Sequence, residues 1–549
     1  MALPAQTKYI VGNEACERFS FYGMRSILVA YMTGMLLMSK NEATEVVHLF
    51  IACTYLLPLL GAWLADRFLG RYRTIISISL LYCLGNAVLA MADFAGDIEA
   101  RKWVLFAGLA IIAVGAGGIK PCVSAFVGDQ VPAGEKNSST MTRLYAAFYW
   151  SINLGSFFSF LVIPWVRQNW GYSWAFGIPG IFMALATLIF WLGRRKYNHV
   201  PPTQPEFLRA LFTRIFRGAA NACERFGGEA VARATSTAIS IAAFIILAPI
   251  VVLLGKWAHS GAAQLALLSG ASDTPAALCG LIVLLLYIIV LALAGLKLAA
   301  STGMKGFLGL AGSMLFNSKE ETNARFTTGE QRGVRNLARV LIVFLMIIPF
   351  WSLYDQTAST WVLQGKQMQS IDLSWGGSIK FCFGAEEMQS FNPLLIMIFV
   401  PLVTLFVYPY IGRWGAPLKR MGMGILLAGI AYGAVAALQQ RLDTGAQLSI
   451  LWQCIPYFLL TLSEILVSTT GLEYAYTAAG KNLKSIVSSF WLLTSTLGNL
   501  LVVFLTSLVN DPASVSAFIL YGSMSLCVGI LFLFVTSRPG FKAEEEENY

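Results

Sequence analysis

The chain has 549 residues, of which 57% are hydrophobic and only 12% are charged. Soluble domains carry about 25% charged residues and rarely grow one core beyond about 250–300 residues, so this composition excludes an ordinary soluble protein and indicates a membrane protein. The formal net charge of +10 does not predict a nucleic-acid partner, because Lys and Arg gather in alternate loops between apolar segments, as in multi-spanning membrane proteins.

Fourteen apolar segments follow one another along the chain. As helices, which satisfy their own backbone hydrogen bonds, such segments can cross the ~30 Å hydrocarbon core of a bilayer. We expect them at 13–38, 46–66, 74–92, 103–121, 141–163, 173–193, 236–255, 276–298, 336–362, 392–411, 421–440, 450–479, 485–509 and 515–536. The predicted fold class is therefore an all-α membrane protein with fourteen transmembrane helices.

The spacing of the segments predicts three parts. Six segments precede the basic stretch 194–235, and six follow the stretch 299–335. We expect an N-terminal six-helix bundle over 1–198, then cytoplasmic linkers over 199–335 with an inserted transmembrane hairpin at about 236–298. A C-terminal six-helix bundle with an acidic tail would occupy 336–549. This arrangement is typical of two-bundle transporters with an inserted hairpin.

The loop charges predict the orientation. The basic loops at 66–73, 193–200 and 412–420 all fall on the side of the N-terminus, and the loops on the other side are mixed or acidic. The positive-inside rule therefore places both termini in the cytoplasm. The first residues show no short apolar core followed by a small-residue cleavage site, so no removable signal peptide is predicted.

The first apolar segment contains the charged stretch "EACERFSFYGMR" at residues 14–25. On a helix, one face of this stretch carries Glu14, Arg18, Tyr22 and Arg25. Glu17 lies beside that face, so the stretch has four charged residues in all. Four charges facing lipid would cost on the order of 10 kcal/mol, comparable to the whole stability of a protein. We therefore expect them to face an interior cavity and to pair, Glu14 with Arg18 in the favourable i, i+4 order. The alternative is that part of this stripe lies at the cytoplasmic interface, with Arg18 extending to it.

Other charged residues fall inside apolar segments of both halves. They are Lys120, Asp355, Glu464 and Glu473, and His48 is predicted at the external end of the second span. Each alone could belong to a structural ion pair. Together they include both signs, as a charged cavity between two bundles would need. Aromatic and polar residues suit the same pocket, although core or lipid packing is the commoner role of any single one: Tyr22, Tyr55, Tyr149, Asn153, Trp351, Asn392, Ser468 and Trp491.

Nothing in the sequence predicts an enzyme, a metal site or a cofactor. The nine cysteines and three histidines are scattered without metal-ligand or disulfide spacing, and no nucleophile–base pair is evident. The stretch "GAGGIKP" lacks the G-x-x-x-x-G-K-[ST] spacing of a phosphate-binding loop and follows a helix. Its glycines instead predict close helix packing. Without a nucleotide motif, an ion gradient is the expected energy source.

Several stretches together resemble the proton-coupled oligopeptide transporters of the major facilitator superfamily. "EACERFSFYGMR" is similar to the family signature E-x-x-E-R-F-x-Y, and "GAWLADRFLGRYRTI" to the loop between helices two and three. "FYWSINLGS" resembles helix five and "PFWSLYDQTASTW" helix seven. "NPLLI", "SEILVSTTGLEYAY" and "WLLTSTLGN" resemble helices eight, ten and eleven. The matches run in order from about residue 8 to 509. In "YTAAGKNLKS" the chain lacks a proline that the family often has after alanine.

The resemblance implies roles for the matched charges. Glu14, Glu17 and Arg18 match the proton-coupling cluster, and Lys120 pairs with it. Arg25 and Lys120 match the cationic side that holds the carboxylate of a peptide.

The opposite side of the implied pocket holds the peptide amine. It matches Glu464, with Asn153 and Asn392. The implied pocket walls are Tyr22, Tyr55, Tyr149, Trp351, Ser468 and Trp491.

An outer gate is implied as well, with Arg25 and Asp355 as partners. His48 matches a histidine that animal members of the family need. The inserted hairpin and the short segment "QQRLDTGAQLS" resemble bacterial members, which implies the bacterial inner membrane.

The implied function is proton-coupled import of di- and tripeptides, with peptide, protons and the lipid bilayer as partners and a single chain sufficient for transport. A free dipeptide carries charges of opposite sign roughly 6–7 Å apart. A cation and an anion at the two ends of a pocket would bind these termini and largely ignore the side chains. The alternatives are a proton-coupled carrier of nitrate or a peptide-like drug, a channel, and a membrane enzyme.

Overall fold

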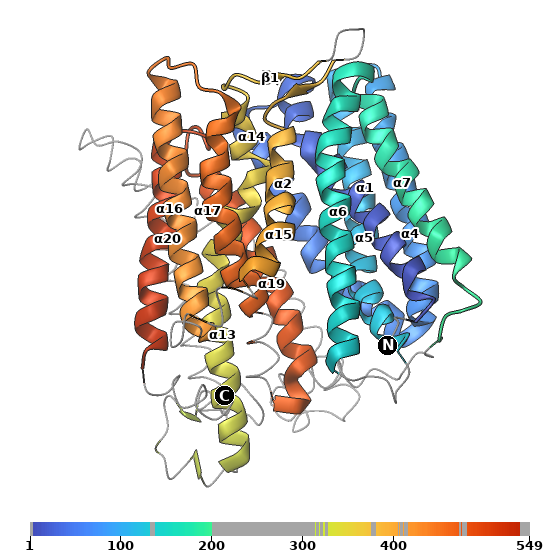
Figure 1. Ribbon diagram of the computed structural model, residues 1–549, viewed down its shortest axis with the longest axis vertical. Coiled ribbons are helices and arrows are strands. Elements are labelled where there is room, and N and C mark those ends of the chain that lie inside the picture. Colours follow the sequence, from blue (N-terminus) through green and yellow to red (C-terminus); the bar gives the residue numbers. More distant parts are fainter. Residues whose placement is uncertain are drawn as a thin grey trace, which may run out of the picture.

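A computed structural model describes residues 4–131, 138–199, 328–374, 380–403, 416–471 and 480–538, with a few isolated positions between them. These residues form long helices that run side by side along the long axis of the molecule (Figure 1). The predicted inserted hairpin at 236–298 and most of the predicted linkers lie outside the described residues.

The first 199 residues contain seven of the described α-helices, which follow the six predicted segments. The second predicted segment is divided between α2 and α3, and a short π-helical stretch, Ala65–Leu69, continues it. The helices are α1 (Thr7–Gly34), α2 (Lys40–Leu56), α3 (Pro58–Leu64), α4 (Gly70–Ala90), α5 (Ile98–Asp129), α6 (Ser138–Trp170) and α7 (Tyr172–Leu192). Within this set, α1 packs against α6 and α7, and α4 packs against α5 and α7.

The described residues after 327 form the remaining helices and a small hairpin. The α-helices are α13 (Thr328–Tyr354), α14 (Thr360–Gly365), α15 (Phe391–Leu402), α16 (Pro417–Asp443), α17 (Cys454–Glu464), α19 (Gly480–Thr506) and α20 (Val515–Thr536). Short helical turns are η4 (Asp355–Ala358), η5 (Glu387–Ser390), η8 (Ile450–Gln453) and η9 (Ile465–Thr469). Strands β1 (Ile371–Asp372) and β2 (Cys382–Phe383) pair antiparallel, with Ile371 opposite Phe383.

Local sequence explains where several helices begin. Ser39 and Glu42 form a capping box at the start of α2, in which each side chain bonds the backbone of the other. Asp97 caps α5 through the backbone N–H of Ala100, at 2.8 Å. Gly171 separates α6 from α7 with φ +84°, a conformation that favours glycine.

The capping box corrects one sequence expectation. The second span was predicted to begin near residue 46, with His48 at its external end. Because Ser39 and Glu42 start α2 at Lys40, His48 lies near the middle of that helix and is fully buried.

Close helix packing at the predicted glycine-rich stretch is confirmed. A Cβ on Gly117 would lie 2.6 Å from Cβ of Leu57, and a Cβ on Gly61 would lie 2.5 Å from Cα of Gly118. Real side-chain atoms do not approach so closely. Glycine in this stretch therefore lets α5 contact α3 and the end of α2 at backbone distance.

The outer surface of the helices is suited to lipid. Eight helical stretches among the described residues are long and apolar enough to cross a membrane. Large apolar side chains are exposed along several of them, for example Trp103, Ile181, Leu345, Ile430 and Phe534. This confirms the helical membrane class, while the total of fourteen spans stays a prediction.

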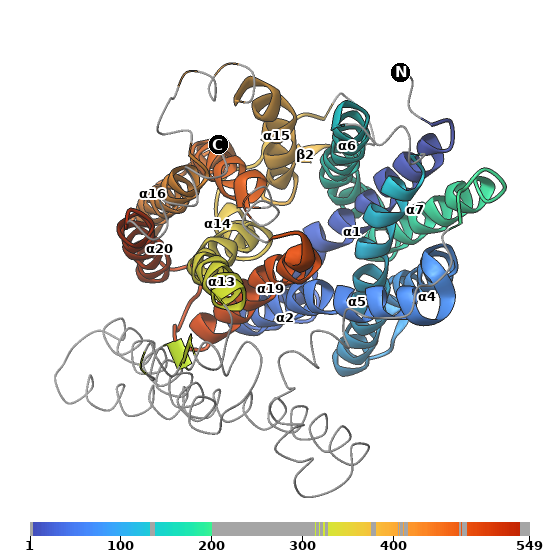
Figure 2. The same ribbon diagram turned by 90° about the horizontal axis from the view of Figure 1, so that it is seen from below.

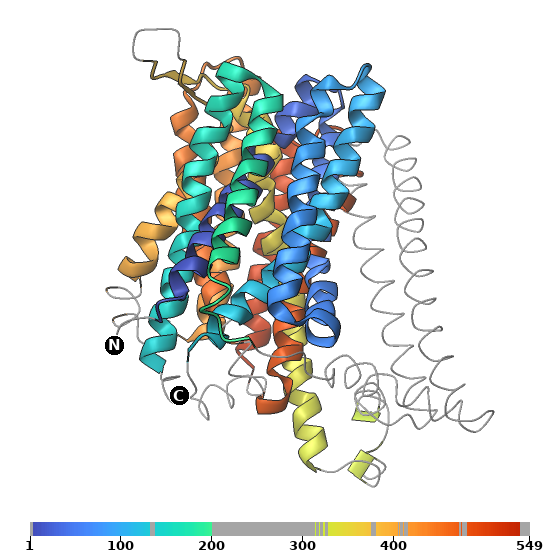
Figure 3. The same cartoon turned by 90° about the vertical axis from the view of Figure 1, so that its right-hand side faces the viewer.

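The two ends of the molecule are distinct. The start of α1 and the end of α20 lie at one end, called here the terminal end, and the β1 hairpin lies at the other, called the β1 end (Figures 1 and 3). Viewed from below, α1 and α4–α7 lie on one side, and α13–α16 and α20 lie on the other (Figure 2). Helix α2 packs against α19 between them, and α6 contacts α15. The division into bundles at 1–198 and 336–549 stays a prediction.

Candidate functional site

Three charged residues near the start of α1 form a buried cluster, called here the α1 cluster: Glu14, Glu17 and Arg18. Nε of Arg18 lies 3.1 Å from Oε1 of Glu14, and a terminal nitrogen of Arg18 pairs with Glu17. All three side chains are buried, with Arg18 only 5% exposed. The structure therefore has Arg18 paired in the interior and not extended to an interface.

Seven residues further along α1, Arg25 begins a second group, called here the Arg25 network. Nη1 of Arg25 lies 3.6 Å from Oδ1 of Asp355 in η4. The other oxygen of Asp355 accepts a 2.7 Å hydrogen bond from Nδ2 of Asn499 in α19. His48 of α2 completes the network, with Nδ1 2.7 Å from Oδ1 of Asn499 and Nε2 2.7 Å from Oγ of Ser359. All five residues are buried.

The hydrogen bonds of the Arg25 network determine which ring nitrogen of His48 carries the hydrogen. An amide nitrogen can only donate and an amide oxygen can only accept. Because Nδ2 of Asn499 donates to Asp355, its Oδ1 must accept from Nδ1–H of His48. Nε2 of His48 then accepts from the Ser359 hydroxyl while the ring is neutral. A carboxylate on η4 is thus connected to an imidazole on α2 through one amide on α19.

Lys120 of α5 contacts aromatic rings. Its Nζ lies 4.1 Å from the ring centroid of Tyr55 and 4.8 Å from that of Phe21, distances at which a cation is attracted to a ring face. Among the described residues, no carboxylate oxygen lies within 4.0 Å of this nitrogen. The ion pair expected between Lys120 and the α1 cluster is therefore not formed in this structure.

On the opposite side, Glu464 ends α17. Its Oε2 accepts a 2.8 Å hydrogen bond from Nδ2 of Asn392, which also lies 3.0 Å from Oγ1 of Thr461. The Tyr354 hydroxyl donates to Oδ1 of Asn392 at 3.3 Å. Among the described residues, no Lys or Arg nitrogen lies within 4.0 Å of the Glu464 carboxylate. Ser468 is turned to its own helix, with Oγ bonded to the backbone oxygen of Glu464.

One cavity brings residues of both halves of the chain together. Six predicted site residues line it: Tyr22, Arg25, Tyr149, Asn153, Asn392 and Glu464. The other lining residues are Ile152, Ser156, Phe160, Tyr354, Thr357, Gln389, Pro393 and Tyr457. A guanidinium and a carboxylate thus line the same cavity, among aromatic rings and amides.

Comparison with known proteins identifies the family. The sequence model of the POT family matches residues 72–524, most of the chain. The chain belongs to the POT family. This confirms the resemblance found in the sequence.

Relatives from animals are similar over most of this POT family chain. Peptide transporter family 1 of Drosophila melanogaster is 31% identical over 454 residues, which cover 81% of this chain and 48% of the relative. Peptide transporter family 1 of Caenorhabditis elegans is 33% identical over 450 residues, which cover 80% of this chain and 45% of the relative. The chain therefore spans about half the length of these relatives.

Solved structures of the family match the whole fold. A crystal structure of an auto-inhibited POT family peptide transporter is 37% identical, with a TM-score of 0.73 and coverage of 97% of both chains. A crystal structure of the POT family transporter PepTSo is 34% identical, with a TM-score of 0.72 and complete coverage of both chains.

Some predicted site residues of this POT family member lie outside the cavity wall. Trp351 and Trp491 contact each other edge to face, with ring centroids 6.1 Å apart, and Trp351 lies 5.7 Å from the ring of Tyr354, which does line the cavity. Trp351 thus contacts both the cavity-lining Tyr354 and Trp491. Tyr55 lies under the Lys120 ammonium, and Glu473 falls outside the described residues.

The sequence interpretation missed several lining residues, although some had a signal. Tyr354 directly precedes Asp355 in an apolar segment, and Ser156 lies one helical turn after Asn153. Thr357 and Gln389 come from the short turns η4 and η5, whose position no periodicity indicates. Among the described residues, no group of three or more His, Cys, Asp or Glu could hold a metal ion.

Proposed function

We propose that this chain is a proton-coupled symporter that imports di- and tripeptides by alternating access. The observation that carries the proposal is a cavity that both Arg25 and Glu464 line. Membership of the POT family supports it, as do the names of the animal relatives, which are peptide transporters.

The proposed binding mode follows from the charges of the cavity. The peptide carboxylate binds Arg25, which must exchange its contact with Asp355 for the ligand, and Lys120 adds positive charge from α5. The peptide amine binds Glu464, whose carboxylate Asn392 orients through the 2.8 Å hydrogen bond. Charged hydrogen bonds of this kind are about twice as strong as neutral ones, and they are lost when a terminus is blocked.

The proposed specificity follows from the remaining wall. Tyr22, Tyr149, Phe160 and Tyr354 present rings to the cavity. Rings accept side chains of many shapes, whereas the fixed separation of the two charges limits the length of the backbone. Di- and tripeptides of varied sequence therefore fit, and longer chains do not.

The α1 cluster is the proposed site of proton coupling. One guanidinium, that of Arg18, is shared by the carboxylates of Glu14 and Glu17. Protonation of one carboxylate weakens its hold on Arg18 and changes how α1 packs. Each proton that enters across 100 mV supplies about 2.3 kcal/mol, enough to drive accumulation of a neutral zwitterion.

Alternating access is proposed to move 1–198 against 336–549. The Arg25 network joins α1 and α2 to η4 and α19 and lies further toward the β1 end than the α1 cluster, by about 10 Å along α1. We assign the terminal end to the cytoplasm and the β1 end to the outside, in the inner membrane of a bacterium. The Arg25 network then closes the outer side, and a single chain suffices for transport.

Transport assays of Glu14→Gln and Glu17→Gln test the coupling site. In proteoliposomes, both variants should retain counterflow exchange of labelled dialanine, because the cavity is unchanged, and should lose accumulation driven by a pH gradient. Glu99→Gln is the matched control, because Glu99 is exposed and 3.8 Å from Lys102 on the surface of α5. Accumulation against a gradient by both α1 variants would exclude this proton site. Uptake that an uncoupler leaves intact would favour a channel.

A further inference from the structure

The end of α6 holds a loop of the other half of the chain. Residues 167–169 follow one another at the β1 end of α6 and contact the segment 380–387, which includes β2 and leads into η5 (Figure 2). These contacts join the first half of the chain to the second, more than 200 residues apart in sequence.

Two side-chain amides imitate a paired strand. Asn169 donates from Nδ2 to the backbone oxygen of Lys380 at 2.8 Å and accepts the Lys380 N–H at 2.9 Å. Gln168 bonds Cys382 in the same way, donating at 2.9 Å and accepting at 3.0 Å. Residues i and i+2 of an extended segment present their backbone groups to the same edge, so two consecutive amides satisfy that edge.

Two buried carboxylates complete the contact. Nε of Arg167 donates to Oε2 of Glu386 at 2.7 Å, and Nε2 of Gln168 donates to Oε1 of Glu387 at 2.6 Å. Glu386 is 4% exposed and Glu387 is 1% exposed. Buried carboxylates that lose their donors are costly, so separation of α6 from this segment is opposed unless water replaces the donors.

The contact continues along the chain to a residue that lines the cavity. Two residues after Glu387, the cavity-lining Gln389 donates from Nε2 to the backbone oxygen of Ser26 on α1, at 3.2 Å. The segment 380–389 therefore closes the way to the cavity between α6 and α1 at the β1 end.

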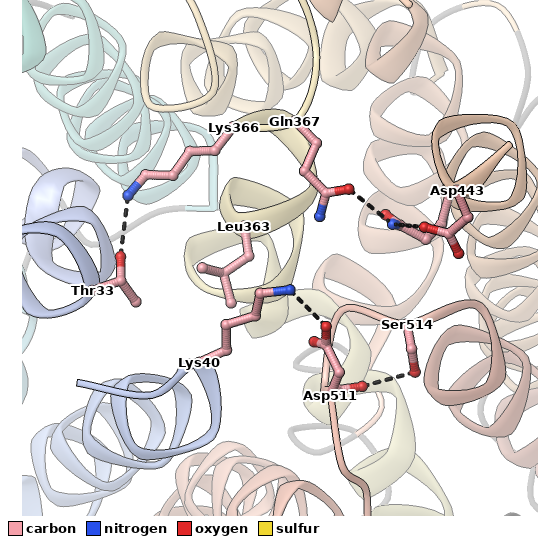
Figure 4. Close-up of a pocket in the computed structure, with 9 residues that line it drawn as sticks. Thr33, Lys40, Leu363, Lys366, Gln367, Asp443, Asp511 and Ser514 are labelled. Atoms are coloured by element: carbon pink, nitrogen blue, oxygen red, sulfur yellow. Dashed lines mark hydrogen bonds and ion pairs between the residues drawn. The ribbon is translucent and has the colours of Figure 1, made fainter. Parts of the chain in front are cut away.

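Elsewhere at the β1 end, Asn41 of α2 donates to the backbone oxygens of Thr506 and Val509, at 3.1 and 2.7 Å, and two further contacts between the halves are single and more exposed. Lys40 pairs with Asp511 at 2.6 Å, with both side chains about 40% exposed (41% and 39%), and Lys366 donates to Thr33 at 3.2 Å (Figure 4). Exposed pairs of this kind contribute little. The contact at the end of α6, with six specific bonds to two buried carboxylates and a backbone edge, is the more extensive.

We propose that residues 167–169 and 380–387 form an outer latch that sets how often the transporter opens its cavity to the outside. The latch rests on the alternating access proposed above and adds a determinant distinct from the cavity and the α1 cluster. Weakening it shifts the population from the closed outer side toward the open one, without removing any group that contacts peptide.

Gln168→Ala and Asn169→Ala test the latch independently. The reporter is Ser156→Cys, which lines the cavity and is reached from the β1 end only when the outer side opens. Intact cells are treated with a membrane-impermeant maleimide, and modification of this cysteine is quantified by peptide mass spectrometry. Loss of a reciprocal pair of hydrogen bonds should raise the modification rate about three- to tenfold. Gln447→Ala is the matched control, because Gln447 bonds Gln369 within the second half.

Modification of the native thiol of Cys382 reports whether the loop alone is released. It therefore distinguishes the proposed latch from a contact that only holds the loop in place. If Cys382 is modified faster in the two variants while Ser156→Cys is not, residues 167–169 only hold the loop and the latch is excluded. Equal rates for the variants and Gln447→Ala exclude it as well. The proposed function is judged separately: unaltered protein that takes up no labelled dialanine under a pH gradient would overturn that function, whereas the modification rates decide the latch.

Discussion

Helix α1 carries two charged groups that differ in how they are built. The α1 cluster pairs Arg18 with two carboxylates of the same helix: Glu17 directly precedes it, and Glu14 lies one helical turn before it. The Arg25 network takes one residue from α1 and completes it with η4, α19 and α2, over sequence separations of 144 to 451 residues. Under the alternating access proposed above, the first group can persist while the halves of the chain move. The second cannot, because its bonds join elements on both sides of the cavity.

Asp355→Ala should give the largest loss of stability. It leaves the buried Arg25 guanidinium without its partner and removes the acceptor of Asn499, which costs on the order of 3–5 kcal/mol. Thermal unfolding of the purified protein in detergent measures the effect. Asp511→Ala is the matched control, since it removes the same side chain from the exposed pair with Lys40 and should cost about 0–1 kcal/mol. Equal losses of stability in the two variants would show that the Arg25 network does not stabilise the fold.

Asn499→Ala should have the next largest effect. The substitution disconnects His48 from Asp355 and leaves both buried groups with a missing partner, at about 1–3 kcal/mol. Asn86→Ala is the comparison, because Nδ2 of the buried Asn86 donates to the backbone oxygen of Tyr82 within its own helix. A smaller loss for Asn499→Ala than for Asn86→Ala would contradict the central place of Asn499. The same unfolding assay decides the order.

Glu14→Gln should cost least, about 1 kcal/mol or less in unfolding free energy, because Glu17 still pairs with Arg18. Its effect is expected on coupling and not on folding. A stability loss as large as that of Asp355→Ala would mean that the α1 cluster holds the fold together, and it would remove the distinction between the two groups.

The same distinction explains what the sequence could predict. Spacing within one helix was sufficient to expect that Glu14, Arg18 and Arg25 share a buried face, and the structure has them buried. Apolar segments likewise placed the helices of the described regions. The partners of Arg25 required tertiary structure: Asp355 followed only from the resemblance, and Asn499 was not identified.

Two further differences have local physical causes. The position of His48 was misjudged because the predicted span began at the apolar residues, although Ser39 and Glu42 carried the capping signal for an earlier start. Lys120 was expected beside carboxylates, but its nitrogen lies over Tyr55 and Phe21. Hydrophobicity patterns contain no term for attraction between a cation and a ring, so such a placement cannot be read from spacing alone.

Competition for uptake of labelled dialanine tests most directly whether Arg25 and Glu464 hold the two peptide termini. Unlabelled dialanine, N-acetyl-dialanine and dialanine amide are compared as competitors in proteoliposomes under an imposed pH gradient. The account predicts that each blocked peptide competes at least about tenfold more weakly than dialanine, as loss of one charged hydrogen-bonding group in a site built for it implies. Equal competition by all three peptides would contradict it.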